Sequence, residues 1–221
     1  MKAKTILISD LLSVGKWRAD LHVHAENELS SEKFKLVRLA EVVTESKTAK
    51  DPAELSKDGF YYIGLEHVEP ITGEPINVTV VDSEQVKSRS KEFQCGDILY
   101  GRLRPYLRKA IYVEPPYISG LCSPEFIVLK AKKQFILPLF LREILISEQV
   151  TELVSRLQTG AALPRVSSKD LLNISIPLPP LQFQEECVKK IERLRSQRRD
   201  LLSKANTATK EGQKVISEIF D

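Results

Sequence analysis

The sequence predicts an α+β protein: a small, twisted, mostly antiparallel sheet with packed helices, followed by one long C-terminal coiled-coil helix. Three observations lead to this class. Short segments rich in β-branched and aromatic residues fill residues 34–132. Apolar residues then recur at three- and four-residue steps over residues 138–158. From Gln182 to the end the sequence has no proline and only one glycine.

The first part of the chain is expected to contain strands because its apolar segments are short and bounded by glycine, proline or aspartate. These segments are Tyr61–Leu65, Ile76–Val81, Asp97–Tyr100, Ala110–Val113 and Phe126–Leu129.

The next part changes period. Residues 138–158 are expected to form one amphipathic helix that stops at Gly160. A loop, Gly160–Arg165, follows it, and then a short strand, Asn173–Leu181, that is ended by prolines, which cannot continue a ladder.

The long helix, residues 182–220, carries a heptad pattern. At ~1.5 Å per residue this helix would be roughly 58 Å long, too long to bury its apolar seam on a domain of ~150 residues. Such a seam is what two packed helices need. A solvated tail is the alternative, since the small residues at 205–212 weaken the seam, although they also allow a close helix approach. The seam residues proposed for dimerisation are Ile191, Leu194, Leu201, Ala205, Ala208, Val215 and Ile219.

Composition limits the class of protein. The chain has 221 residues, 42% hydrophobic and 29% charged, as expected for a soluble globular protein. No apolar run approaches the ~18 residues that a membrane span needs, and Met1–Asp10 does not resemble a signal peptide. Three cysteines, far apart, argue against a disulfide framework and favour a reducing cytoplasm. The net charge of +3 is only mildly basic, so a nucleic-acid site must come from local clustering.

Two motifs resemble catalytic sites but lack their required companions. His22 and His24 have the spacing of a metal-dependent hydrolase, but the only other histidine is His67. Glu114–Tyr117 resembles the catalytic tetrapeptide of adenine methyltransferases, but no glycine-rich loop follows a strand to hold S-adenosylmethionine. We therefore expect no catalysis, cofactor or metal, with the hydrolase as the alternative in a different class.

A loop rich in basic residues is stronger evidence of a functional site. Arg102, Arg104, Arg108 and Lys109 lie within eight residues, with Tyr106 among them. Arginine pairs with phosphates and with guanine edges, and an aromatic ring packs on bases or sugars. A solvated basic loop at a sheet edge explains the composition equally well.

A second block is more specific. Gly160–Asp170 leads into Leu171–Leu181, and Gln184 stands near the start of the long helix. This block resembles the end of a target recognition domain in type I restriction-modification specificity subunits, almost residue for residue. The stretch around Gly96–Lys109 and the opening Phe34–Val43 also resemble blocks of that family, so the resemblance covers roughly residues 34–220.

The sequence departs from the family in two ways. Family members usually have two recognition domains and two long helices, whereas this sequence has one of each, and the order at the helix start is Gln182–Glu185. Trp17–Asp20 resembles the lead-in to a second recognition domain in fused type II enzymes. A detached recognition domain of a fused restriction-methylation enzyme is therefore the second alternative.

The resemblance implies a non-catalytic, DNA-binding subunit of the cytoplasm. It would read half of a bipartite target in double-stranded DNA and direct a partner adenine methyltransferase subunit and a motor-nuclease subunit. Residues 1–30 would be an unassigned extension, 31–180 the target recognition domain and 181–221 the dimerisation and spacer helix. A chain with one recognition domain would restore the family's architecture as a homodimer.

The resemblance also ranks the contact residues. Arg102, Arg104, Arg108 and Lys109, with Tyr106, form the first expected DNA-contact set, and Arg165 and Lys169 form the second. The stretch Lys189–Lys204, with seven basic and two acidic side chains, would be a docking face for the methyltransferase, a cover over the DNA spacer, or a solvated helix face.

Overall fold

The computed structural model describes residues 29, 31–52, 59–86 and 88–220. His22, His24 and the whole of the expected extension up to residue 28 lie outside them. The chain divides into two compact units, one ending at Pro179 and the other beginning at Pro180.

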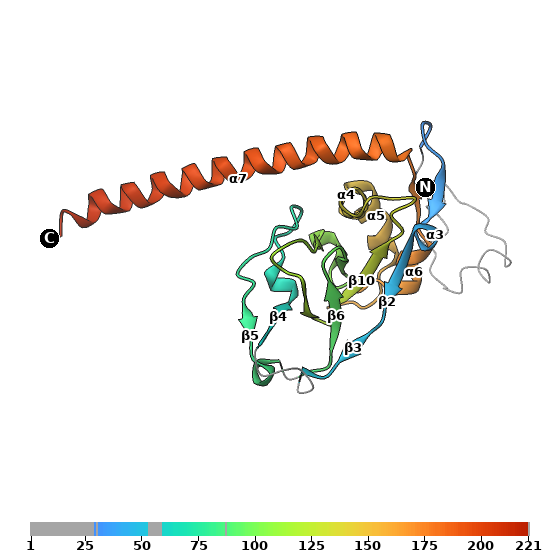
Figure 1. The fold of residues 1–221 in the computed structure, drawn as a ribbon, viewed down its shortest axis with the longest axis horizontal. Coiled ribbons are helices and arrows are strands. Elements are labelled where there is room, and N and C mark those ends of the chain that lie inside the picture. Colours follow the sequence, from blue (N-terminus) through green and yellow to red (C-terminus); the bar gives the residue numbers. More distant parts are fainter. Residues whose placement is uncertain (1–28, 30, 53–58, 87, 221) are drawn as a thin grey trace. The chain divides into compact units, whose positions relative to one another are not determined.

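The first unit is built on two main sheets (Figure 1). The four-stranded sheet is antiparallel throughout and has the order β2 (Val43–Ser46), β10 (Phe126–Ala131), β7 (Ile98–Gly101) and β8 (Ala110–Tyr112). The five-stranded sheet has the order β3 (Ala49–Lys50), β6 (Ser90–Gln94), β9 (Ser119–Cys122), β4 (Phe60–Ile63) and β5 (Val80–Val81). Only the β4–β9 pair in it is parallel. A third pair joins β1 (Leu36–Arg38) to β11 (Ser175–Pro177).

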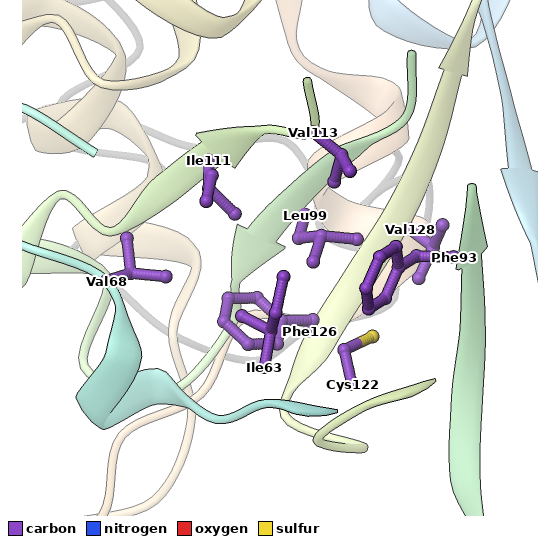
Figure 2. Packing of buried hydrophobic residues seen from close by; sticks show 9 residues of the cluster. All are labelled: Ile63, Val68, Phe93, Leu99, Ile111, Val113, Cys122, Phe126 and Val128. Carbon is purple, nitrogen blue, oxygen red and sulfur yellow. The ribbon is translucent and has the colours of Figure 1, made fainter. Parts of the chain in front are cut away.

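The core is formed by residues from both sheets (Figure 2). β10 is buried along Phe126–Leu129, and its side chains alternate in direction. Phe126 and Val128 join the cluster in the figure. Against β7, β8 and β10 packs helix α4 (Pro138–Leu145), so the four-stranded sheet is covered by a helix as well as by the other sheet. The members of the cluster are Ile63, Val68, Phe93, Leu99, Ile111, Val113, Cys122, Phe126 and Val128.

The remaining helices of this unit are short. They are α3 (Leu39–Val42), α5 (Glu148–Leu157) and α6 (Ser168–Asn173), with 3₁₀ turns η3 (Leu65–His67), η4 (Ser83–Gln85) and η5 (Pro105–Leu107). The expectation of one helix over residues 138–158 is wrong, because α4 ends at Leu145 and α5 starts at Glu148. Ser147 lies between them, and its hydroxyl accepts a hydrogen bond from the Val150 amide at 3.3 Å. Serine at this position favours a new helix start over a continuous helix.

Two predicted strands are also corrected. Of Ile76–Val81 only Val80 and Val81 are in a strand, because Asn77 has a left-handed backbone (φ 49°) that interrupts an extended ladder. Asn173–Leu181 is mixed: Asn173 ends α6, and the strand is limited to Ser175–Pro177. The α+β class with mostly antiparallel sheets is confirmed.

The second unit is the helix α7, Leu181–Ser217, which is continuous over 37 residues (Figure 1). The predicted long C-terminal helix is therefore confirmed, whereas its pairing in a coiled coil stays a prediction. Its large apolar side chains are mostly exposed, Leu201 at 66% and Val215 at 62% among them. In the described part of the chain, no helix combines the length and apolar character needed to cross a membrane.

Candidate nucleic-acid interface

The arginine loop, residues 102–109, joins the buried strand β7 to β8. Its centre is η5, whose first residue, Pro105, is buried. Arg104 and Arg108 flank η5 with left-handed backbones, φ 50° and 53°. The Leu107 amide donates to the Arg104 carbonyl and the Arg108 amide to the Pro105 carbonyl, both at 2.9 Å. These bonds give the loop a single compact shape.

The glycine loop, residues 159–165, lies beside the arginine loop. The Arg104 amide donates to the Pro164 carbonyl at 2.7 Å, and the Val166 amide donates to the Arg102 carbonyl at 3.0 Å. Leu103 and Arg165 form a β-bridge, and Thr159 and Arg165 exchange two hydrogen bonds of 2.8 Å. The two motifs that carry the family resemblance, far apart in the sequence, are thus one hydrogen-bonded surface.

Glu125 connects the two loops, and nothing in the sequence pattern marked it. Its carboxylate accepts hydrogen bonds from Arg165 Nε at 3.0 Å and Nη2 at 2.8 Å, and its carbonyl accepts one from the Arg102 amide at 2.9 Å. The hydrogen bond to Glu125 raises the pKa of the Arg165 guanidinium above its usual value. Most of the guanidinium N–H donors of Arg165 are therefore bonded to acceptors within the protein.

Arg108 and Lys109 are likewise engaged with the protein. Arg108 Nε donates to the Ile146 carbonyl at 2.6 Å, and its guanidinium forms an ion pair with Glu148 at 3.3 Å. Lys109 Nζ donates to the Leu65 carbonyl at 2.7 Å. These contacts fasten the arginine loop to the α4–α5 junction on one side and to η3 on the other. The DNA-contact role expected for both stays a prediction, with this anchoring role beside it.

The remaining expected contact residues are better placed for a ligand. Arg104 and Lys169 are exposed, and Tyr106 is 50% exposed. Arg102 is half-buried, and among the described residues its buried Nε has no hydrogen-bond partner. The structure brings Arg102, Arg104 and Tyr106 together on the arginine loop, whereas Lys169 stands on α6.

Of the two motifs that resemble catalytic sites, only Glu114–Tyr117 lies within the described residues. Glu114–Tyr117 is a turn, closed by the Tyr117 amide and the Glu114 carbonyl at 3.1 Å. The Tyr117 ring packs edge-on against Tyr61, with 5.1 Å between ring centres, so it is occupied within the fold. Within the described ranges, no group of three or more His, Cys, Asp and Glu side chains is placed to hold a metal ion.

The seam residues from Ile191 to Val215 lie on α7, whereas Ile219 lies beyond the end of the helix at Ser217. Ile191 is half-buried, and the others are exposed: Leu194, Leu201, Ala205, Ala208, Val215 and Ile219. An apolar row on a single helix, left in water by the chain itself, is typical of a surface that a partner covers.

Comparison with known proteins covers both units of the chain. The family model for the type I restriction modification DNA specificity domain matches residues 31–220. The type I restriction enzyme EcoDI specificity subunit of Escherichia coli is 28% identical over 166 residues, which are 72% of this chain and 35% of that subunit. The HindI specificity subunit of Haemophilus influenzae is 26% identical over 99 residues, 43% of this chain and 21% of that subunit.

Solved structures agree with the sequence comparison. The HsdS subunit from Thermoanaerobacter tengcongensis is 28% identical, with a TM-score of 0.67 that covers 77% of this chain and 44% of that one. A chain from structural work on complex assembly and conformational transition of the type I R-M system has the same TM-score of 0.67 and 28% identity, covering 82% of this chain and 47% of that one. The chain spans less than half the length of each of these relatives. The match over residues 31–220 and the shared fold lead to one conclusion: the chain belongs to the type I restriction modification DNA specificity domain family.

Proposed function

We propose that this chain is the non-catalytic subunit that gives a type I restriction-modification complex its DNA sequence specificity. The family match over residues 31–220 carries the proposal, because it includes both loops that form the basic surface. Exposed Arg104 and half-buried Arg102 supply guanidinium groups for phosphates or guanine edges, and Tyr106 supplies an aromatic face. The inward contacts of Arg108 and Arg165 support the function by keeping those loops in one arrangement.

The partners follow from the family. The subunit binds double-stranded DNA in the cytoplasm and directs an adenine methyltransferase subunit, with a motor-nuclease subunit, to a bipartite target. A relative of the same fold was studied for complex assembly in a type I R-M system, which supports a role within a larger complex. The methyltransferase would hold the S-adenosylmethionine, so this chain needs no cofactor of its own.

The chain would act as a homodimer. Residues 31–180 form the target recognition domain in this proposal, and residues 181–221 form the dimerisation and spacer helix. Two observations support pairing of the helix. Its seam residues from Leu194 to Val215 are exposed in the single chain. Gly212 lies inside α7, where glycine costs ~1 kcal/mol relative to alanine, and among the described residues nothing lies within 4 Å of a Cβ built on it. A second helix at close range would use that space.

Deletion of the gene in its host tests the proposal directly. Single-molecule sequencing of the deletion strain is expected to show that adenine methylation disappears from one bipartite motif while the other methylated motifs remain. Restoring the wild-type gene is expected to restore the mark at the same motif. A methylation pattern identical in the wild-type and deletion strains would contradict the proposed function.

A further inference from the structure

A third loop, the turn Glu69–Glu74, is bonded to the arginine loop. The Ile71 amide donates to the Arg108 carbonyl at 3.1 Å. Because Arg104 in turn donates to Pro164 at 2.7 Å, the three loops are joined in series by backbone hydrogen bonds. In the sequence, the turn lies outside the arginine loop and the glycine loop. Only the structure places it beside them.

The backbone conformation of Ile71 is unusual. Four non-glycine residues of the described chain have positive φ: Ile71, Asn77, Arg104 and Arg108. Three of the four belong to the linked loops. A β-branched residue at φ 69° is a genuine outlier, because the side chain crowds its own backbone, and such residues concentrate at functional sites.

The turn holds Ile71 firmly in this conformation. The Gly73 amide donates to the Glu69 carbonyl and the Glu69 amide to the Glu74 carbonyl, both at 2.9 Å, and the Thr72 hydroxyl donates to the Glu69 carboxylate. A Cβ on Gly73 would lie 2.1 Å from the Ala110 carbonyl oxygen and 2.3 Å from the Arg142 guanidinium. The turn therefore rests directly on β8 and α4, and Ile71 projects from it with 54% of its surface exposed.

Each of the three loops exposes one large side chain with an apolar body. Ile71 is 54% exposed, Tyr106 50% and Leu163 46%, and Arg104 is exposed among the same loops. Apolar side chains on loops that also carry the exposed Arg104 match a ligand that offers both phosphate charge and apolar groups. In the major groove of DNA, the apolar group that a base offers is the C5 methyl group of thymine.

We propose that Ile71 is a specificity-determining residue that contacts a thymine C5 methyl group in the major groove of the target. The inference rests on the proposed function and deepens it. The guanidinium groups of Arg102 and Arg104 hold the protein on the DNA, and the rigid turn holds an apolar side chain beside the base edges. Ile71 carries no charge, so its contribution is to base preference and leaves the salt dependence of binding unchanged.

Selection of sites from a randomised duplex library tests the inference, with the full chain in complex with the methyltransferase subunit from the same genome. Wild type is expected to select a motif that contains an invariant thymine, and Ile71→Ala a motif that is degenerate at that position. Ile118→Ala is the matched control, because Ile118 is also exposed, at 61%, and lies on none of the three loops. The same motif from wild type and Ile71→Ala would overturn the inference, whereas no motif from wild type would instead overturn the proposed function.

Replacing that thymine by deoxyuridine removes the methyl group alone. Wild-type binding is expected to weaken about fourfold, the value of one buried methyl-sized group, and Ile71→Ala binding is expected to stay the same on both duplexes. An equal loss for both proteins would show that another residue contacts the methyl group, which overturns the assignment.

Ile71→Gly separates base contact from folding. Glycine relieves the positive φ, so the melting temperature is expected to equal or exceed that of wild type, while the selected motif is degenerate as for Ile71→Ala. Asn77→Gly relieves the same kind of backbone strain at an exposed site (φ 49°) and is expected to leave the motif unchanged. If Ile71→Gly weakened binding equally on every duplex, Ile71 would only position the loop, and the base-contact role would be wrong.

Discussion

Arg104 and Arg108 share a left-handed backbone on either side of η5, but their side chains meet different surroundings. Arg108 donates to the Ile146 carbonyl and pairs with Glu148, whereas Arg104 is exposed. Arg165 is turned toward Glu125 in the same way that Arg108 is turned toward Ile146. At the scale of single residues, the basic surface is thus divided into side chains that hold the loops and side chains that are available to a ligand.

Arg102 and Arg104 are expected to lie in the DNA interface. Each Arg→Ala change should cost about 1–3 kcal/mol of binding free energy if it removes a base contact, or lower the salt slope by about one if it removes a phosphate contact. Titration of the methyltransferase complex with target DNA at several salt concentrations measures both. Lys133→Ala, which removes an exposed charge in the turn after β10, is the control. Equal binding by the double variant and wild type would mean that the interface uses a different loop.

The Glu125–Arg165 pair is expected to hold the glycine loop against the arginine loop. Glu125→Gln removes the charge that the guanidinium faces, so the hydrogen bonds of the Arg104 and Val166 amides should open more often. Hydrogen–deuterium exchange of these two amides should therefore be faster in Glu125→Gln and in Arg165→Ala. The double variant should exchange no faster than either single one, because each change breaks the same contact. Additive rates would argue that the two side chains act separately.

At the scale of elements, α7 differs from the other α-helices of the described chain. The short helices α4, α5 and α6 each have buried apolar residues, whereas α7 has Leu194, Leu201 and most of its other large apolar side chains in water. A helix with an uncovered apolar row gains stability from a partner rather than from its own sequence.

Aspartate at Leu194 and Leu201 is expected to convert a dimer of the chain into monomers. The two charges would be buried in the seam, where desolvation costs several kcal/mol. Sedimentation velocity at tens of micromolar measures the change. Ser196→Asp with Ser203→Asp adds the same charge at the same spacing on the other side of the helix and should leave the dimer intact. A wild-type chain that sediments as a monomer at that concentration would count heavily against helix pairing.

At the scale of the whole molecule, the chain is expected to bind no S-adenosylmethionine by itself. The sequence has no glycine-rich loop after a strand, and the Tyr117 ring of the methyltransferase-like tetrapeptide packs on Tyr61. Calorimetry with the cofactor and the purified chain should give no saturable heat. Binding at micromolar affinity, roughly −8 kcal/mol, would contradict the non-catalytic assignment.

A homodimer predicts the form of the DNA target. Two identical chains related by a two-fold axis present identical reading surfaces in opposite directions, and DNA strands are antiparallel, so both chains meet the same sequence. The target should be a palindrome interrupted by several base pairs, since α7, with 37 residues at ~1.5 Å each, separates the two domains by tens of ångströms. Mapping of methylated adenines in host DNA checks this. An asymmetric motif would mean that the chain pairs with a different half-subunit. The homodimer would then be wrong, whereas the proposed role in DNA recognition would remain.

Several features followed from the sequence because they depend on neighbouring residues. The long helix was expected from a heptad pattern in a stretch without proline, and α7 covers Leu181–Ser217 where residues 182–220 were expected. The strands β7, β8 and β10 were predicted to within two residues, because buried apolar segments bounded by turn residues have few other conformations. The family was identified from local blocks, and the family match over residues 31–220 confirms it.

Other features were decided by tertiary contacts. β3 and β6 lack a strong local pattern and become strands by pairing in the five-stranded sheet, β3 with β6 and β6 also with β9. The direction in which Arg165 and Lys109 point depends on Glu125 and on the Leu65 carbonyl, which are distant in the sequence. The link between Ile71 and Arg108 is a backbone hydrogen bond, which a pattern of side chains in the sequence does not predict. The sequence by itself therefore determined the class, the long helix and the family, since propensity and periodicity are local. Which basic side chains remain free for a ligand was decided by the tertiary structure, because a charged group turns toward whatever acceptor the fold brings within reach.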